Sequence, residues 1–143
     1  MTSSHRRPTL ADEAAFTLIE LLVVVLILGA LVGIAVPSYL HFEAKAQSTT
    51  AAAAVRDVIP AANAYYVENS SYTGMSAESL RSTYDSGLAI SQDGSTGIVS
   101  AKPVGNGQQY CISAVSGNRW AHYSGPGGSI IVDPSTVTEN PCP

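Results

Sequence analysis

The chain has 143 residues, which is enough for one domain around one core and too few for two ordinary ones. Apolar residues make up 45% of the sequence and charged residues 13%, and the net charge is −4. The lysines and arginines after the first seven residues stand singly rather than in clusters. The sequence therefore does not support binding to nucleic acid through phosphate contacts, because such binding needs clustered cations.

The amino-terminal third predicts a membrane span. Residues 1–15 are polar and include Arg6 and Arg7, whereas in residues 16–36 the only ionisable side chain is that of Glu20. At about 1.5 Å per residue, the apolar stretch is long enough to cross a hydrocarbon core of about 30 Å. Arg6 and Arg7 favour a cytoplasmic amino terminus, with the long carboxy-terminal part exported.

Two ordinary interpretations of this span leave Glu20 unexplained. One is a secretory signal peptide cut near residues 44–46, and the other is an uncut single-span anchor. A carboxylate inside the span costs on the order of 2–3 kcal/mol unless it lies at the headgroup level. If the chain is cut between Ala15 and Phe16, the new ammonium on Phe16 lies only four residues from Glu20. The ammonium of a neighbouring subunit then pairs with this carboxylate in dry surroundings, where the attraction is strong.

The residues around this site resemble a known signature. Residues 16–29 read FTLIELLVVVLILG and residues 34–39 read IAVPSY. From residue 15 to about residue 40 the chain resembles the amino terminus of type IV pilins and the related pseudopilins. The resemblance implies cleavage between Ala15 and Phe16 by a prepilin peptidase, amino-methylation of Phe16, and an assembly role for Glu20. The chain departs from the family pattern at Ala15, where glycine usually precedes the cut.

Three further residues of this segment bear on helix packing and helix continuity. Gly29 and Gly33 form a small-xxx-small pattern that lets membrane helices approach closely, although the spacing is also compatible with chance. Pro37 lacks a backbone donor and is expected to kink or break the helix. By resemblance, the stretch from Gly29 to Pro37 can unwind in a filament.

Residues 37–68 predict an amphipathic continuation of the helix. Its apolar positions step by four, three, four and three residues, which is one helical face. Pro60 lies within this pattern and predicts a second bend. We expect the apolar face to dock on a sheet. Its members are Ala51, Val55, Val58, Ala62 and Tyr65.

Residues 69–143 predict an exported headgroup made of loops and short strands. Turn residues separate the strand candidates, and the best hairpin joins two of them through Ser116, Gly117 and Asn118. The predicted fold class is α+β: a long N-terminal helix, membrane-spanning in its first half, packed on a small antiparallel β-sheet. The strand candidates are Gly87–Ser91, Ile98–Lys102, Gln109–Val115, Arg119–Tyr123 and Ser129–Asp133.

The two cysteines of the chain, Cys111 and Cys142, lie in the predicted headgroup. An even number of cysteines in an exported chain indicates one disulfide, and the alternative is two free buried thiols. The resemblance adds that pilin headgroups have a carboxy-terminal disulfide that bounds a variable surface loop.

The sequence contains no pattern typical of an enzyme or of a cofactor site. The three histidines lie far apart, and no spacing resembles a zinc site. Aspartates bind calcium if loops gather them, as in some pseudopilins, but we interpret those in this chain as solvated turn residues. No cofactor and no metal site are expected. The residues concerned are His5, His41, His122, Asp85, Asp93 and Asp133.

The resemblance implies a structural subunit of a type IV pilus. Such a subunit waits in the cytoplasmic (inner) membrane with its carboxy-terminal domain outside, and then polymerises through its N-terminal helix into an extracellular filament for adhesion, twitching motility or DNA uptake. Its partners are other pilins (copies of itself and minor pilins), the prepilin peptidase, the pilus assembly platform and, before assembly, the membrane. The alternatives are a pseudopilin of a type II secretion system and a membrane-anchored exported binding domain.

Overall fold

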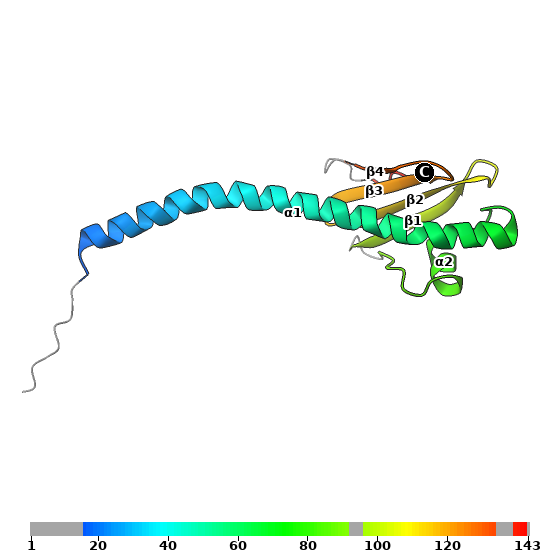
Figure 1. Cartoon of the computed structure of the whole chain (residues 1–143), viewed down its shortest axis with the longest axis horizontal. Coiled ribbons are helices and arrows are strands. Elements are labelled where there is room, and N and C mark those ends of the chain that lie inside the picture. The colour runs from blue at the N-terminus through cyan, green and yellow to red at the C-terminus, as the bar shows by residue number, and fades with distance from the viewer. Residues whose placement is uncertain (1–15, 92–95, 134–138, 143) are drawn as a thin grey trace, which may run out of the picture. The chain divides into compact units, whose positions relative to one another are not determined.

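The computed structural model describes residues 16–91, 96–133 and 139–142 (Figure 1). The described chain divides into two compact units, Met1–Tyr39 and Leu40–Pro143, and the first helix begins in one and ends in the other. The elements in chain order are α1 (Leu18–Asn69), α2 (Ala77–Thr83), β1 (Gly97–Val104), β2 (Gln109–Ser116), β3 (Arg119–Gly125) and β4 (Ile130–Val132).

The first unit consists of the amino-terminal part of α1. The mean hydropathy of its most apolar stretch is 2.9 and none of that stretch is buried, so the helix is long and apolar enough to cross a membrane. The helix is continuous across Gly29, Gly33 and Pro37, so the expected break is not a feature of the single chain. Pro37 removes one N–H donor, and the turns on either side keep theirs. Unwinding within a filament stays a prediction.

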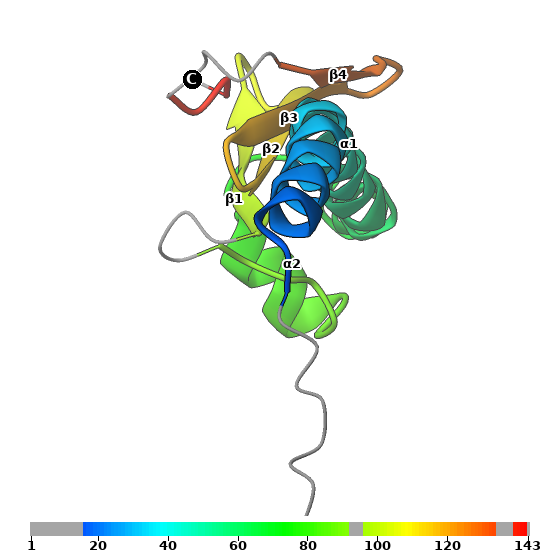
Figure 2. The same cartoon turned by 90° about the vertical axis from the view of Figure 1, so that its left-hand side faces the viewer.

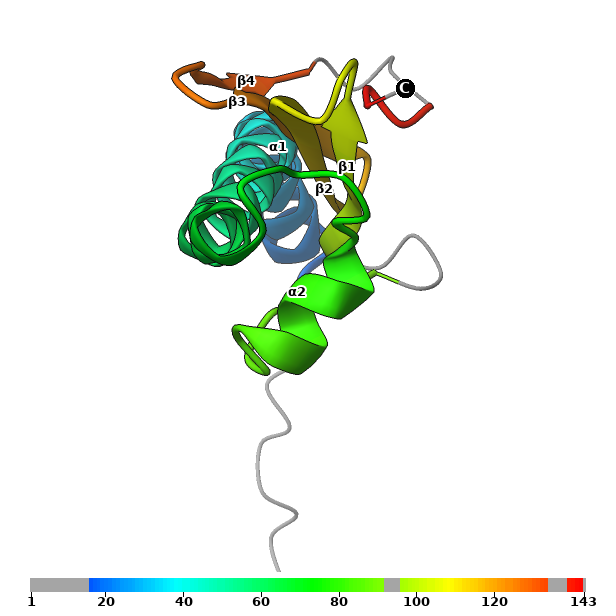
Figure 3. The same ribbon diagram turned by 90° about the vertical axis from the view of Figure 1, so that its right-hand side faces the viewer.

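In the second unit, α1 lies across one face of the sheet (Figures 2 and 3). Ala51, Val55, Val58 and Ala62 are completely buried, and Tyr65 packs against the edge of the same core. The expected docking face is therefore confirmed. Alanine at two of these positions lets the helix backbone come close to the sheet, and the helix runs through Pro60 without interruption.

The sheet is an antiparallel meander in the order β1-β2-β3-β4. The expected hairpin between β2 and β3 is confirmed, with Ser116 paired to Arg119 across Gly117 and Asn118. Gly117 has a φ of 57°, which a glycine adopts without steric cost at the first central position of such a turn. Four of the five strand candidates are strands, with ends that differ from the expected ones by a few residues.

The prediction of a strand at the remaining candidate, Gly87–Ser91, was wrong. Only Ile90 forms a bridge, a single parallel one with Ile98. Asp85 accepts a hydrogen bond from the Gly87 N–H at 2.9 Å, so the start of this run belongs to a turn and only its end reaches the sheet.

The sequence interpretation also missed α2, a short helix beside β1 (Figures 2 and 3). Ser76 and Ser79 satisfy each other's backbone donors at its start, in a reciprocal cap that precedes a single buried leucine, Leu80. Seven residues are too few to show an apolar periodicity, so only the capping pattern identifies the helix.

Strand β2 is buried on both of its faces. Tyr110, Ile112 and Ala114 belong to the core under α1, whereas Cys111 and Ser113 point the other way, because successive side chains of a strand alternate between its faces. Residues 139–142 are attached to this outer face. The predicted disulfide is present between Cys111 and Cys142, whose Cα atoms are 5.6 Å apart.

A second attachment holds the tail to β2. Ser113 Oγ donates a hydrogen bond to Asn140 Oδ1 at 2.6 Å, and the Cys142 N–H donates to the same oxygen at 3.0 Å. Because Ser113 is completely buried, its hydroxyl depends on this partner. The disulfide and the amide therefore fix the tail at two neighbouring points of one strand.

We expect that replacing both Cys111 and Cys142 with alanine will destabilise the second unit by about 3–4 kcal/mol, the loop-closure contribution for a bridge of this span. Urea unfolding of residues 40–143 measures the change. Addition of a reductant lowers the midpoint of the wild type and leaves that of the double variant unchanged. An equal response of both proteins contradicts the prediction.

Four tyrosines form a continuous stack within the core. The ring centroids of Tyr66 and Tyr72 are 4.8 Å apart, those of Tyr72 and Tyr110 are 4.5 Å apart, and those of Tyr110 and Tyr123 are 5.8 Å apart. The Tyr110 ring lies against Gly125, where a Cβ would collide with it. The Tyr110 hydroxyl has no hydrogen-bond partner among the described residues, and burial raises its pKa well above the usual range, with smaller contributions from Tyr123 and Tyr72.

A Tyr110→Phe substitution is expected to change the free energy of unfolding at pH 7 by no more than about 1 kcal/mol, because the hydroxyl it removes is unpaired. The raised pKa of Tyr110 means that the fold prefers the neutral phenol. In the unfolded chain a tyrosine has a pKa of about 10. Below that pH the stability of the fold is unaffected by this preference, and above it the free energy of unfolding falls by up to about 1.4 kcal/mol per pH unit. Denaturant midpoints at pH 7 and pH 11 should therefore diverge less in the variant. An identical alkaline loss in both proteins rules this out.

Candidate functional site: the amino-terminal end of α1

The side chains of Thr17 and Glu20 close the first turn of α1. Glu20 Oε2 accepts hydrogen bonds from the Thr17 hydroxyl at 2.9 Å and from the Thr17 N–H at 3.3 Å. In return, the Glu20 N–H donates to Thr17 Oγ1 at 3.3 Å. Thr17 directly precedes the helix, which begins at Leu18, so the pair is a capping box.

This cap gives Glu20 a local partner as well as the predicted intersubunit one. The first N–H groups of a helix have no intrahelical acceptor, and the helix dipole favours a negative charge beside them. Both effects lower the cost of a carboxylate at this depth. Sequence reasoning singled out Glu20 for its charge and missed Thr17. A threonine followed three residues later by a glutamate, before an apolar run, is the recognised sequence pattern of a capping box.

Phe16 lies at the open end of this turn and is 76% exposed. Ala15 lies outside the described residues, so the structure describes one side of the expected cut. The positions of Phe16 and of the Glu20 carboxylate, at the same end of one helix, are what the predicted chemistry requires. A cut before Phe16 places a new ammonium within one helical turn of a fixed carboxylate.

The other candidate residues are distributed over the second unit. His122 on β3 pairs with Asp133 beyond β4, with Nδ1 and Oδ2 2.7 Å apart, and the Asp133 N–H donates to the Trp120 carbonyl. Ser113 lies opposite His122 in the β2–β3 register. Its hydroxyl is completely buried and donates to Asn140, and no hydrogen bond to His122 occurs among the described residues. These three residues therefore fasten the end of the sheet and the tail.

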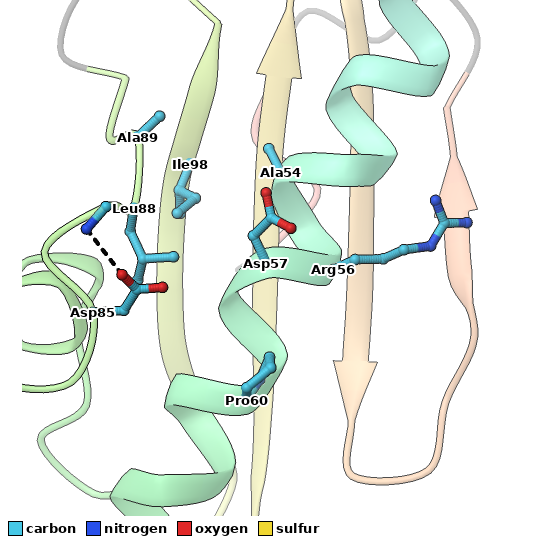
Figure 4. A pocket seen from close by; sticks show the side chains of 9 residues that line it. Ala54, Arg56, Asp57, Pro60, Asp85, Leu88, Ala89 and Ile98 are labelled. Atoms are coloured by element: carbon cyan, nitrogen blue, oxygen red, sulfur yellow. Dashed lines mark hydrogen bonds between the residues drawn. The ribbon is translucent and has the colours of Figure 1, made fainter.

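A cavity of about 360 Å³ lies between α1 and the segment that leads into β1 (Figure 4). Asp57 and Asp85 bring carboxylates to its wall, and Asp85 is already engaged with the Gly87 N–H. Among the residues that the structure describes, no group of three or more histidine, cysteine, aspartate or glutamate side chains is placed to hold a metal ion. Asp93 and His5, also considered from the sequence, lie outside the described residues.

A comparison with family models identifies the amino-terminal segment. The model described as the prokaryotic N-terminal methylation motif matches residues 10–36, which include Ala15, Phe16, Thr17 and Glu20. Comparison with curated proteins and with solved structures gave no match for the chain. The match therefore concerns the site and the apolar helix that follows it, and not the second unit.

Replacing Thr17 with alanine removes the hydroxyl that joins the capping box, and we expect a loss of about 1 kcal/mol in the stability of the first turn. The Glu20 N–H, which donates to the Thr17 hydroxyl, and the Leu21 N–H, which donates to the Thr17 carbonyl, should then exchange with solvent about fivefold faster, as measured by NMR of the full chain in detergent micelles. The matched control, Thr17→Ser, keeps the hydroxyl and should exchange like the wild type. Equal exchange in all three proteins contradicts a capping role.

Proposed function

We propose that this chain, whose residues 10–36 carry the signal motif shared by type IV pilins and pseudopilins, is a structural subunit of a type IV pilus. The single observation that carries the proposal is the carboxylate of Glu20, which is held at the start of a helix whose next sixteen residues are all uncharged. An ordinary membrane anchor does not need this group. A helix that packs against identical helices uses it to set their register.

Before assembly, the precursor is anchored by the apolar part of α1. In the proposal, a prepilin peptidase cuts between Ala15 and Phe16 on the cytoplasmic side and methylates the new amine, which keeps its positive charge. The leader that carries Arg6 and Arg7 is thereby removed. The mature chain begins with an ammonium directly in front of an exposed apolar helix.

Assembly then pairs the Phe16 ammonium of one subunit with the Glu20 carboxylate of another. Two unit charges about 4 Å apart attract by about 4 kcal/mol at an effective dielectric constant of 20, and more strongly as water is excluded. The Thr17 hydroxyl holds the Glu20 carboxylate in place at 2.9 Å, so part of the ordering needed for that pairing is already present in the single subunit.

The apolar residues of the first unit that the structure describes, from Phe16 onward, are exposed in the single chain, Leu18 by 83% and Ile34 by 75%. In the membrane they contact lipid, and in a filament they contact the same helix of neighbouring copies. The second unit carries its own core and disulfide and therefore remains folded on the exported side. Adhesion, twitching motility and DNA uptake are the uses that such a filament serves.

A pseudopilin of a type II secretion system shares the amino-terminal motif and is the alternative. The bond between Cys111 and Cys142 favours the pilin, because a disulfide near the carboxy terminus is what the resemblance to pilin headgroups implies. The partners proposed for the chain are other pilin subunits, the prepilin peptidase and the pilus assembly platform.

A Glu20→Gln substitution tests the proposal sharply, because glutamine also completes a capping box but carries no charge. We expect the variant to be inserted and cut like the wild type, with Phe16 at the amino terminus of both, and to form at least tenfold fewer surface filaments. Mass spectrometry of the terminus and electron microscopy of the cells measure the two effects.

The control Glu20→Asp retains the charge on a shorter side chain and should assemble better than Glu20→Gln. An amino terminus other than Phe16 in the wild type overturns the proposal. So does full assembly of the Glu20→Gln variant.

A further inference from the structure

Three basic side chains line one shallow cavity of about 230 Å³ in the second unit. His41, Lys45 and Ser48 follow one another at i, i+4 and i+7 on one side of α1, and Arg119 enters from the start of β3. The turn before Arg119 lies against the helix, because a Cβ on Gly117 would meet the side-chain amide of Gln47 at 2.6–2.7 Å. The hairpin thus brings Arg119 of β3 beside His41, Lys45 and Ser48 of α1.

The cavity is positively charged without local compensation. Lys45 and Arg119 are two of the five lysines and arginines that follow the leader. The described residues that line the cavity include no carboxylate, and the nearby Glu43 lines a separate cavity, where it accepts a hydrogen bond from Gln47 at 3.3 Å.

One residue that lines this cavity, Arg119, has a donor without an acceptor. The Nε–H of Arg119 is shielded from solvent and has no hydrogen-bond partner among the described residues. A shielded donor without a partner is unfavourable, and an arginine donor bonds most strongly to an anionic oxygen. The chemistry that completes this cavity is therefore that of a phosphate or a carboxylate.

The positions of His41 and Lys45 in the sequence indicate where such an anion comes from. His41 and Lys45 follow Val36, the last residue of the apolar stretch, by only five and nine residues. Cations this close to the exported end of a span run against the usual distribution, which places them on the cytoplasmic side. A basic side chain that follows so closely on a span can reach the lipid phosphates at its end, and anionic headgroups attract such side chains.

We propose that His41, Lys45 and Arg119 bind the phosphate of an anionic phospholipid at the exported surface of the membrane while the precursor is stored there. The inference rests on the proposed function only in requiring that the chain wait in a membrane. Ser48 donates its hydroxyl to the Ala44 carbonyl at 2.9 Å, so it lines the cavity without adding a donor. Binding fixes the side of the second unit that carries this cavity next to the lipid headgroups, and extraction of the subunit into a filament releases the lipid.

The test uses the full chain in detergent micelles, titrated with phosphatidylglycerol or phosphatidylcholine, with bound lipid counted by native mass spectrometry. We expect phosphatidylglycerol to bind more tightly to the wild type. The double variant Lys45→Gln/Arg119→Gln should lose about 25-fold in that affinity, since each cation near an anionic lipid contributes a factor of about five. The single variant Lys45→Gln, at an exposed position, should lose about fivefold and is the reference if the double variant does not fold.

The matched control is Lys102→Gln/Arg81→Gln, which removes the same two charges from exposed positions elsewhere in the second unit. It should bind phosphatidylglycerol like the wild type, and Lys45→Arg/Arg119→Lys should also keep the preference. Equal affinity of the wild type for the two lipids overturns the proposal, and so does an equal loss in the control. Displacement of the lipid by inorganic phosphate at the same concentration overturns the lipid as the ligand.

The outcome is separable from that of the proposed function. If the lipid preference is absent while the mature amino terminus is Phe16 and filaments form, only the lipid site fails. If the cavity variants lose filaments but keep the lipid preference, the cavity belongs to a contact between subunits, and the lipid site is wrong. An amino terminus other than Phe16 overturns the pilus subunit and leaves the lipid measurement standing.

Discussion

The second unit depends on the burial of β2 from both sides. One face of this strand packs Tyr110, Ile112 and Ala114 into the core under α1, and the other face carries Cys111 and Ser113 beneath the carboxy-terminal tail. An antiparallel sheet of four short strands with one open face leaves much of its apolar surface in water. The helix packs on one side of the sheet, and residues 139–142 are fastened to β2 on the other.

This arrangement frees the amino-terminal half of α1 from any part in the fold of the second unit. Among the described residues, the buried core of this unit begins at Ala51. The apolar side chains of residues 18–36 are exposed in the single chain, and in the proposed function they contact lipid first and other subunits later. A subunit that must leave a membrane and enter a filament needs this separation, because its headgroup has to stay folded while the surroundings of the helix change.

At the amino-terminal end of α1, two side chains meet a local requirement and, in the proposed function, an intermolecular one as well. Thr17 and Glu20 satisfy backbone donors that any helix end must satisfy. The same hydrogen bonds hold the Glu20 carboxylate where an incoming ammonium can reach it. Under the proposed function, helix capping and subunit pairing depend on one geometry, and the cap by itself lowers the cost of an acidic residue at the start of an otherwise apolar segment.

The sequence by itself determined the features that rest on local pattern. The apolar stretch, the lone Glu20, the helical face from Ala51 to Ala62 and the hairpin at Gly117 follow from periodicity, charge and turn chemistry, which act over a few residues. Four strands of the sheet were recognisable for the same reason. Gly87–Ser91 was not a strand, because a turn formed by Asp85 competes with pairing, and such competition is decided only when the neighbouring segments are in place.

Tertiary structure alone decided which distant residues meet. No spacing in the sequence places Arg119 beside Lys45, or Asn140 over Ser113, because these contacts are set by the docking of a hairpin on a helix and of a tail on a sheet. The same holds for Tyr110, whose ring lies against Gly125 and whose buried hydroxyl has no partner among the described residues. Short-range physics fixes what each segment of this chain is, whereas the packing of a shared core determines what each segment touches.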